Sequence, residues 1–370
     1  MHRRQLLQAA AAIAAPSVLT RARAASRLRV GISLPLSSVQ APVAADLQAG
    51  LQLAFARARE RGLEIVAEWE DDRSEPERTA KAIELFGKDP SFAATTSIVG
   101  TPHAIRALPL ATQLGLPVVG IRSGAAELRD GRAGVYHLRA SFNDELSRMV
   151  GLAKGSSLDK LAVVYSDDAF GRASIAHVRS IAPGLGVEIT AATAAERNGS
   201  NVEKMVTAAL DAPGQKPRGL LLLMIAEPME KGVRHAREKH LFPYPILAMS
   251  FCATRALAES KAPYLLGLGL MSAFPLPRVD ASPLSQDFRR LAQAFKPGAD
   301  ASLTSYEGFV YGSVLAEACK RAGDGSRAAI REALSRPLNI GGYRIAFNPM
   351  NVGLHYLQTL RKSHDGVLRA

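Results

Sequence analysis

Short apolar segments alternate with amphipathic segments along residues 28–139 of the chain. The apolar segments LRVGISL, LEIVAEWE, TTSIVG, LPVVGI and VYHLR lack a clean polar alternation, which is typical of parallel strands covered on both faces. Between them, amphipathic helices are predicted at about 42–61, 76–88 and 101–114. The pattern predicts a parallel α/β unit.

The same alternation starts again after residue 140. Helices are predicted at 144–155, from about 170, near 201–211 and near 228–239. The intervening strands are LAVVYS, GVEITAA, GLLLLMI, PILAMS and LLGLGLM. The chain is therefore predicted to hold two successive α/β units rather than one large sheet.

A Pro- and Ser-rich bridge, PLPRVDASPLS, follows the second unit. After it, helices are predicted at about 284–296, 304–322 and 326–335, followed by the strand-like YRIAF and LHYLQTLRK. This helical block has no sheet of its own, so it must pack on an earlier unit. The chain then crosses between the lobes more than once, and such a connection acts as a hinge rather than a loose linker.

The first 24 residues have the composition of a signal peptide. Arg3 and Arg4 precede an apolar stretch that ends at Leu19, and Ala22-Arg23-Ala24 has the small-x-small form that signal peptidase cleaves after. The twin arginine resembles a twin-arginine export signal, and the sequence leaves that route and the general secretory route open. Cysteine is absent near the cleavage point, so no lipid anchor is expected. The mature chain is expected to be a soluble periplasmic protein, because no later apolar run reaches 18 residues.

Length, composition and net charge are those of an ordinary globular protein and bear mainly on the number of domains and on possible partners. A length of 370 residues suits two domains, and 47% hydrophobic and 22% charged residues are globular values. Removing the leader lowers the net charge from +12 to +8, because it carries four arginines and no acid. The remaining basic residues are scattered without interleaved aromatics, which argues against nucleic acid as a partner. Cys252 and Cys319 are too few for a disulfide scaffold and are expected to be free thiols.

Signatures of catalysis or of a cofactor are missing. The sequence has no GxxxxGK[ST], HExxH, GxSxG, CxxC or GxGxxG motif, and its histidines lack ligand spacing. The pairs Asp71-Asp72 and Asp167-Asp168 are interpreted as turn or capping carboxylates, since neighbours in a strand point to opposite faces. We therefore expect no enzyme activity, no cofactor and no metal ion.

Two strand ends carry hydroxyl residues. TTSIVG ends at Gly100, and Thr101 is expected as the N-cap of a helix with Pro102 in its first turn. The next strand ends at Ser123 and Gly124. Helix N-termini at the carboxyl edge of a parallel sheet attract anions, so two hydroxyls and nearby backbone amides there suit a carboxylate. Ordinary helix capping is the alternative interpretation.

The order and spacing of six sequence segments resemble those of type I periplasmic binding proteins of the leucine/isoleucine/valine-binding class, the solute receptors of ABC importers. The resemblance covers essentially the whole mature chain. It rests on VGISLPLSS, VGTPHAIRALPLATQLGLPVVGIRSGAAELR, VYHLRASFNDEL, LAVVYSDDAFGR, TSYEGFVYGSVLAEACKRAG and LNIGGYRIAFNP.

The resemblance implies an α/β fold of two Rossmann-like lobes with parallel sheets, joined by a three-strand hinge, with ligand held between the lobes. The crossings are expected near Arg139–Phe142, Ser272–Leu276 and Pro337–Gly341. The expected division is a signal peptide at 1–24, a first lobe made of 25–140 and 274–337, and a second lobe made of 141–273 and 338–370.

The resemblance also implies where the ligand binds. It places a carboxylate clamp at Thr101 and Ser123–Ala125, and an aromatic side chain of the second lobe, Phe170, opposite it. The candidate ligand-binding residues are Ser37, Ser38, Thr101, Pro102, Arg122, Ser123, Gly124, Ala125, Phe170, Glu227, Ser250 and Phe251.

Two departures bear on the ligand. Amino-acid-binding members usually carry an acid near the position of Ser250–Cys252, and here only Glu227, one strand end away, can substitute. Arg122 places a cation where small uncharged residues are usual. Both changes make the cleft more positive, so a carboxylate that lacks an ammonium group competes with an α-amino acid as the expected ligand.

The implied function is a non-catalytic, monomeric receptor that closes on an amino acid or related small carboxylate and presents it to an ABC permease. The same fold serving a signalling partner is the alternative, and the sequence does not separate the two. An enzyme on this scaffold would need a nucleophile–base pair, which the sequence lacks. A transcription regulator is opposed by the leader and by the missing N-terminal helix-turn-helix.

Overall fold

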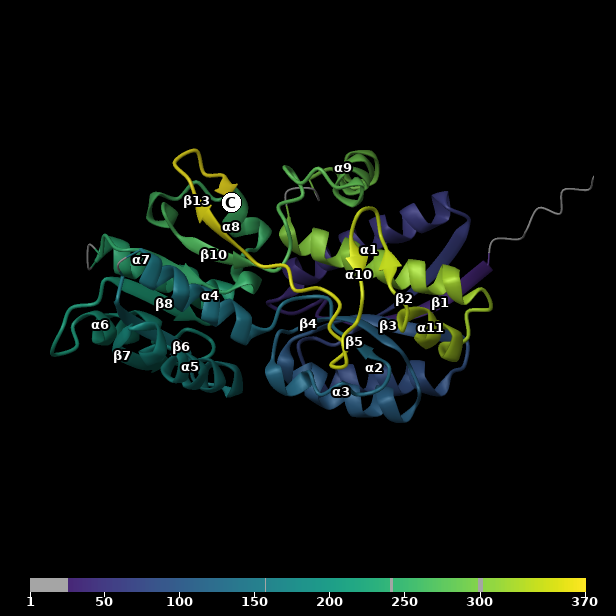
Figure 1. Ribbon diagram of the computed structural model, residues 1–370, viewed down its shortest axis with the longest axis horizontal. Helices are drawn as coiled ribbons and strands as arrows, with labels where there is room; N and C mark the ends of the chain where they lie inside the picture. The colour runs from purple at the N-terminus through teal and green to yellow at the C-terminus, as the bar shows by residue number, and fades with distance from the viewer. Residues whose placement is uncertain (1–25, 157, 240–241, 299–301) are drawn as a thin grey trace, which may run out of the picture.

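The computed structural model describes residues 26–156, 158–239, 242–298 and 302–370. The chain forms two α/β lobes that lie side by side (Figure 1). The predicted signal peptide, 1–24, lies outside the described residues. Within the described part of the chain, no helix is long and apolar enough to cross a membrane.

The first lobe is built on a five-stranded parallel sheet in the order β2-β1-β3-β4-β5. Its central strand is buried at every position, as expected for a sheet covered on both faces. Helices α2 and α3 cover one face, and α1 and α10 cover the other (Figure 1). The elements of this lobe are β1 (Ser26–Leu34), α1 (Ala41–Glu60), β2 (Leu63–Asp71), α2 (Pro76–Lys88), β3 (Phe92–Val99), α3 (Thr101–Gln113), β4 (Val118–Arg122), β5 (Val135–Tyr136), α9 (Pro283–Phe295), α10 (Leu303–Ala322) and α11 (Arg327–Leu334).

The second lobe is built on a seven-stranded sheet in the order β14-β13-β10-β9-β8-β6-β7. Five of its strands, β6 to β10, are parallel, and β13 and β14 add antiparallel pairs at one edge. The predicted α/β class is confirmed. The elements of this lobe are α4 (Phe142–Gly155), β6 (Lys160–Ser166), α5 (Ala169–Ile181), β7 (Glu188–Ala195), α6 (Val202–Leu210), β8 (Gly219–Leu223), α7 (Ala226–Glu238), β9 (Ile246–Ala248), η3 (Ser250–Cys252), α8 (Arg255–Glu259), β10 (Gly269–Ser272), β13 (Gln358–Lys362) and β14 (Leu368–Arg369).

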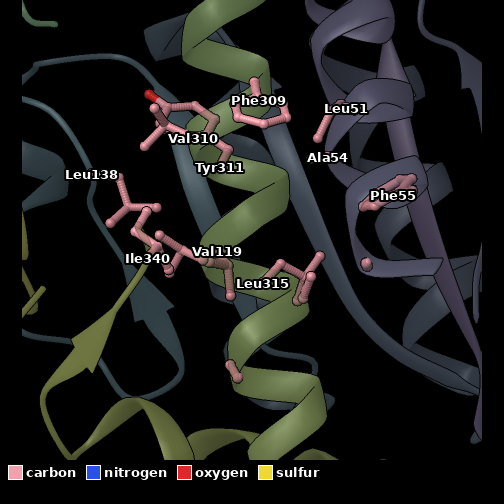
Figure 2. Close-up of a cluster of buried hydrophobic side chains, with 14 of the residues drawn as sticks. Leu51, Ala54, Phe55, Val119, Leu138, Phe309, Val310, Tyr311, Leu315 and Ile340 are labelled. Carbon is pink, nitrogen blue, oxygen red and sulfur yellow. The ribbon is translucent and has the colours of Figure 1, made fainter. Parts of the chain in front are cut away.

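Helix α10 returns the chain to the first lobe and is buried along most of its length. It lies very close to α1: a Cβ added at Gly308 would lie 2.5 Å from the carbonyl oxygen of Leu47. Figure 2 shows Phe309 and Tyr311 of α10 among side chains of α1 and of the sheet. The helical block therefore completes the first lobe's core, because a helix that is apolar on most sides is stable only when other elements cover it.

Within the described residues the chain passes between the lobes three times: after β5, after β10 and before β13. The third passage comes later than the expected Pro337–Gly341. Residues 338–345 form a hairpin of β11 (Leu338–Asn339) and β12 (Arg344–Ile345), whose apolar side chains are buried in the first lobe's core. The expected lobe boundary at 338 is therefore corrected, since the chain joins the second sheet only from β13 onward.

The first and third passages are tied together. The amide of His137 donates to the carbonyl of Asn351 at 2.8 Å, and the amide of Gly353 donates to the carbonyl of His137 at 2.9 Å. These bonds hold two of the three connecting segments as a short parallel pair. The lobes are thus joined in part by paired extended chain.

Candidate functional site

The hydroxyls of Thr101 and Ser123 meet at the carboxyl edge of the first sheet. Strands β3 and β4 are neighbours, with Val99 opposite Arg122, so their ends lie together. Thr101 Oγ1 lies 2.8 Å from Ser123 Oγ, and the two residues are only 7% and 1% exposed. The expected proximity of the two hydroxyls is therefore present in the fold, and they hydrogen-bond to each other.

Helix α3 begins one residue earlier than expected. Gly100, with φ of 95°, precedes it, and Thr101 is its first residue rather than its N-cap. The Thr101 hydroxyl lies at the helix N-terminus, where the dipole is positive, and its hydrogen-bond partner is the Ser123 hydroxyl.

Gly124, Pro102 and Ala125 differ in how closely other residues pack around them. A Cβ added at Gly124 would lie 2.6 Å from the ring of Phe142, whose amide donates to the carbonyl of Gly124 at 2.7 Å. Gly124 is therefore a close contact between β4's end and α4 at the first passage between the lobes. Pro102 is exposed on α3, and Ala125 is buried.

Three phenylalanines of the second lobe form one aromatic cluster beside this edge. The ring centroids of Phe142, Phe170 and Phe251 lie 5.1–5.5 Å apart in edge-to-face pairs. Phe142 was not anticipated as a site residue, although it begins the helix directly after the expected first crossing. The cluster gives the second-lobe side an apolar surface next to the hydroxyl pair.

Arg122 is paired, so it does not make the cleft more positive as expected. Its Nε donates to Glu307 Oε2 at 3.1 Å, and both side chains are nearly buried. The other carboxylate oxygen of Glu307 accepts from Arg139 Nη1 at 3.0 Å and from the hydroxyl of Tyr311 at 2.7 Å. The charge of Arg122 is therefore compensated within the first lobe and the passage beside it.

A carboxylate does reach Ser250, from α4 rather than from a strand end. Glu145 Oε2 accepts from the Ser250 amide at 2.8 Å, and its Oε1 accepts from the Ser250 hydroxyl at 2.7 Å. Glu145 is also bonded to Arg139 Nη2 at 3.3 Å. Burial raises the pKa of Glu145, and the Arg139 guanidinium opposes that rise. The acid near Ser250 is therefore already paired with a cation.

We call Arg122, Arg139, Glu145 and Glu307 the buried ion network. Burial alone would lower the pKa of Arg139, but Glu307 and Glu145 together hold that pKa above its usual value. The network joins α4 of the second lobe to α10 of the first through the passage between them. It leaves a cavity of only about 10 Å³ around itself. Local sequence does not predict this network, because Glu307 is 168 residues from Arg139.

The remaining candidate residues lie at the edges of the cleft. Ser37 hydrogen-bonds to Asp71, and the Ser38 hydroxyl lies 2.7 Å from that of Ser74. Glu227 is exposed in the first turn of α7. The carboxylate of Asp71 thus holds the loops after β1 and β2, in agreement with its interpretation as a turn residue.

A cavity of about 410 Å³ lies between the lobes, beside the candidate residues rather than among them. Three residues of its wall are close in sequence to candidate residues: His103 follows Thr101 by two residues, Gln40 follows Ser38 by two, and Ile225 precedes Ala226–Glu227. The strand ends therefore indicate the region of the cavity, although not the residues that line it. The first lobe contributes Val39, Gln40, Ser74 and His103 to its wall, and the second contributes Glu196, Arg197, Asn198 and Ile225.

A larger hollow, of about 590 Å³, lies elsewhere. Pro245 and Gly267 line it, and these residues precede β9 and β10. It is therefore at the amino-terminal ends of the second sheet's strands, whereas open α/β sheets bind ligands at the carboxyl ends. We take the cavity between the lobes as the candidate site.

Residues 27–346 match the family model described as periplasmic binding protein. A possible leucine/isoleucine/valine-binding protein from Rhodopirellula baltica SH 1 is 25% identical, with a TM-score of 0.84 over 94% of this chain and 97% of that chain. A substrate-binding periplasmic protein from Ralstonia solanacearum is 27% identical, with a TM-score of 0.83 over 92% and 99%.

A solute-binding protein of an ABC transporter from Rhodopseudomonas palustris BisB5, in complex with 3,4-dihydroxybenzoic acid, is 17% identical. Its TM-score is 0.77 over 92% of this chain and 95% of that chain, which shows a shared fold. No curated protein matches the chain significantly. The chain belongs to the periplasmic binding protein family, and its fold is that of the type I, leucine/isoleucine/valine-binding-like members.

Proposed function

We propose that this protein is the periplasmic receptor of an ABC importer, which binds a small carboxylate between its lobes and closes by bending at the hinge. The observation that carries the proposal is the hydroxyl pair of Thr101 and Ser123 at the start of α3. Each hydroxyl can donate to one oxygen of a carboxylate in place of their mutual bond. The positive end of the helix dipole favours the same charge.

The ligand's head group is a carboxylate, and the surroundings favour an acid without an ammonium group over an α-amino acid. An ammonium group taken out of water needs a carboxylate partner. Glu145, which lies at Ser250, is already bonded to Arg139, and Glu227 is exposed to solvent. The phenylalanine cluster suits an apolar body attached to the carboxylate.

We further propose that residues 1–24 are a signal peptide and that the mature chain works as a monomer in the periplasm with a membrane permease. The family supports this location, and the basic residues and apolar stretch of the leader support export, by either the twin-arginine or the general secretory route. Mass spectrometry of the periplasmic fraction tests it. A mature chain that still begins at Met1 would contradict the proposal.

A thermal-unfolding screen against small carboxylates and amino acids tests the receptor function. A ligand present at 100 times its dissociation constant stabilises the folded protein by about 2.7 kcal/mol. We expect at least one carboxylate to raise the melting temperature, and the corresponding amide or ester to have no effect. If no carboxylate in the screen raises it, the proposed function is wrong.

A further inference from the structure

The free volume of the cleft lies beside His103 and not at the hydroxyl pair. About 410 Å³ is open there, against about 10 Å³ beside the buried ion network. Both lobes contribute to the wall of this cavity, which we call the distal cavity. We propose that the distal cavity binds an uncharged hydroxyl or amide group at the far end of a carboxylate longer than a simple amino acid. This inference rests on the proposed function, because the hydroxyl pair holds the other end.

His103 is the residue that points to a ligand. It is only 6% exposed, and neither ring nitrogen hydrogen-bonds to any described residue. A backbone group of Ser74 lies near enough to favour the protonated ring, but neither ring nitrogen forms a hydrogen bond with it. Buried polar groups are nearly always satisfied, so an unpaired imidazole in a cavity wall indicates a partner that enters the cavity.

The charges around the distal cavity favour an uncharged group. Burial lowers the pKa of His103, and the Asp72 carboxylate opposes this only in part, so the ring is neutral near pH 7. On the facing wall, Arg197 is bonded to Asp168, and Glu196 lies beside it. No surplus positive charge is left among these described residues to hold a second carboxylate.

A neutral imidazole offers one donor and one acceptor. Two amides of the wall are partly used within the protein: Gln40 Nε2 donates to the Ser74 hydroxyl, and Asn198 Oδ1 accepts from the Ser200 amide. The carbonyl oxygen of Gln40 can still accept and the amide nitrogen of Asn198 can still donate. A hydroxyl or amide group both donates and accepts, so it satisfies such partners, whereas an apolar end leaves them unpaired.

The strand order sets the length of the ligand. In the first sheet the order β4-β3-β1-β2 carries the hydroxyl pair at β4 and β3, and Gln40 and Ser74 after β1 and β2. Neighbouring strands lie about 4.8 Å apart, so the ligand must span about 10 Å, two strand spacings. In the second sheet Phe170 follows β6, between the strands that lead to Ile225 and Arg197. Phe170 therefore follows a strand that lies between the two strands leading to the second-lobe wall of the distal cavity.

Calorimetric titration with matched acids tests the inference. The probes are cinnamate and 4-hydroxycinnamate, benzoate and 4-hydroxybenzoate, and leucine, which is shorter and has no polar far end. We expect the wild type to bind 4-hydroxycinnamate at least tenfold more tightly than cinnamate. His103→Leu should reduce that ratio to about one and leave the affinity for cinnamate unchanged within threefold. His103→Asn, which keeps a donor and an acceptor, should restore part of the ratio.

Two controls separate this inference from the proposed function. His177→Leu, at a half-buried histidine of α5 that lies 3.2 Å from the Ser147 hydroxyl and does not line the distal cavity, should leave both affinities unchanged. Thr101→Ala should weaken both acids of a pair alike. A hydroxyl preference that survives in His103→Leu overturns the distal cavity alone, as does leucine binding at least as tightly as 4-hydroxycinnamate. If none of the probes binds, both the distal cavity and the proposed carboxylate specificity are contradicted.

Discussion

Replacing Arg139 with methionine tests the buried ion network, because this guanidinium is 1% exposed and bridges both lobes. It donates to Glu307 at 3.0 Å, to Glu145 at 3.3 Å and to the hydroxyl of Ser250. Glu307 keeps Arg122 and Tyr311 as partners after the substitution. Glu145 keeps only Ser250, so it is the carboxylate left without a cation.

The magnitude follows from that unpaired carboxylate. Removing one partner of a buried ion pair costs about 3–5 kcal/mol of unfolding free energy. Burial already raises the pKa of Glu145, and loss of Arg139 raises that pKa further. The folded variant then takes up a proton more readily than the unfolded chain, so its stability increases relative to the wild type as the pH falls. The loss should therefore be larger at pH 8 than at pH 5.5.

Urea unfolding followed by circular dichroism at both pH values measures the effect. Arg336→Met is the matched control, because Arg336 pairs with Glu332 on the exposed face of α11's end and should cost less than about 1 kcal/mol. Adding Glu145→Gln to Arg139→Met should recover part of the loss. A loss below about 1 kcal/mol in Arg139→Met at pH 8 would show that the network contributes little to folding.

Three further predictions concern the hinge and the cores. Burial lowers the pKa of His137 to about 4, so the unfolded chain takes up the proton before the folded one as the pH falls. The wild type should therefore lose about 3 kcal/mol of unfolding free energy between about pH 6.5 and about pH 4, and urea unfolding of His137→Gln should show a smaller loss over that range. Gly124→Ala should destabilise the protein by about 1–3 kcal/mol in thermal unfolding, because the added Cβ would lie 2.6 Å from a phenylalanine ring. Gly151→Ala, in open space within α4, should instead stabilise it by about 0.5–1 kcal/mol, and equal effects of the two substitutions would refute the close contact at Gly124. Cys252 and Cys319 are free and buried, and burial raises the pKa of both thiols. A thiol reagent should therefore react slowly with the native protein and detect two thiols in the denatured, unreduced protein, and detection of none would contradict this.

The two-lobed fold was predictable because buried parallel strands have a distinctive composition. Segments such as GLLLLMI are apolar at successive positions, and this signal needs no tertiary information. The hairpin at 338–345 was assigned to the wrong lobe for the opposite reason. Its strands are two residues each, and only the contact of Leu338 and Ile345 with the first core decides their place.

The candidate site likewise contains one contact that the sequence predicts and one that it does not. Thr101 and Ser123 follow adjacent strands, so their proximity can be read from strand order. The pairing of Arg122 with Glu307 joins residues 185 apart and depends on how α10 packs on the sheet. Local sequence carries no record of such a contact, which is why Arg122 was interpreted as an uncompensated cation.

The receptor account depends most directly on the hydroxyl pair of Thr101 and Ser123. Calorimetric titration of the best carboxylate from the screen should show binding weakened about 10- to 100-fold in Thr101→Ala and in Ser123→Ala, because a hydrogen bond to a charged group contributes about 1.5–3 kcal/mol. Thr112→Ala, at the far end of α3, is the matched control and should bind like the wild type. Unchanged affinity in both Thr101→Ala and Ser123→Ala would contradict the account, since the carboxylate would then be held elsewhere in the molecule.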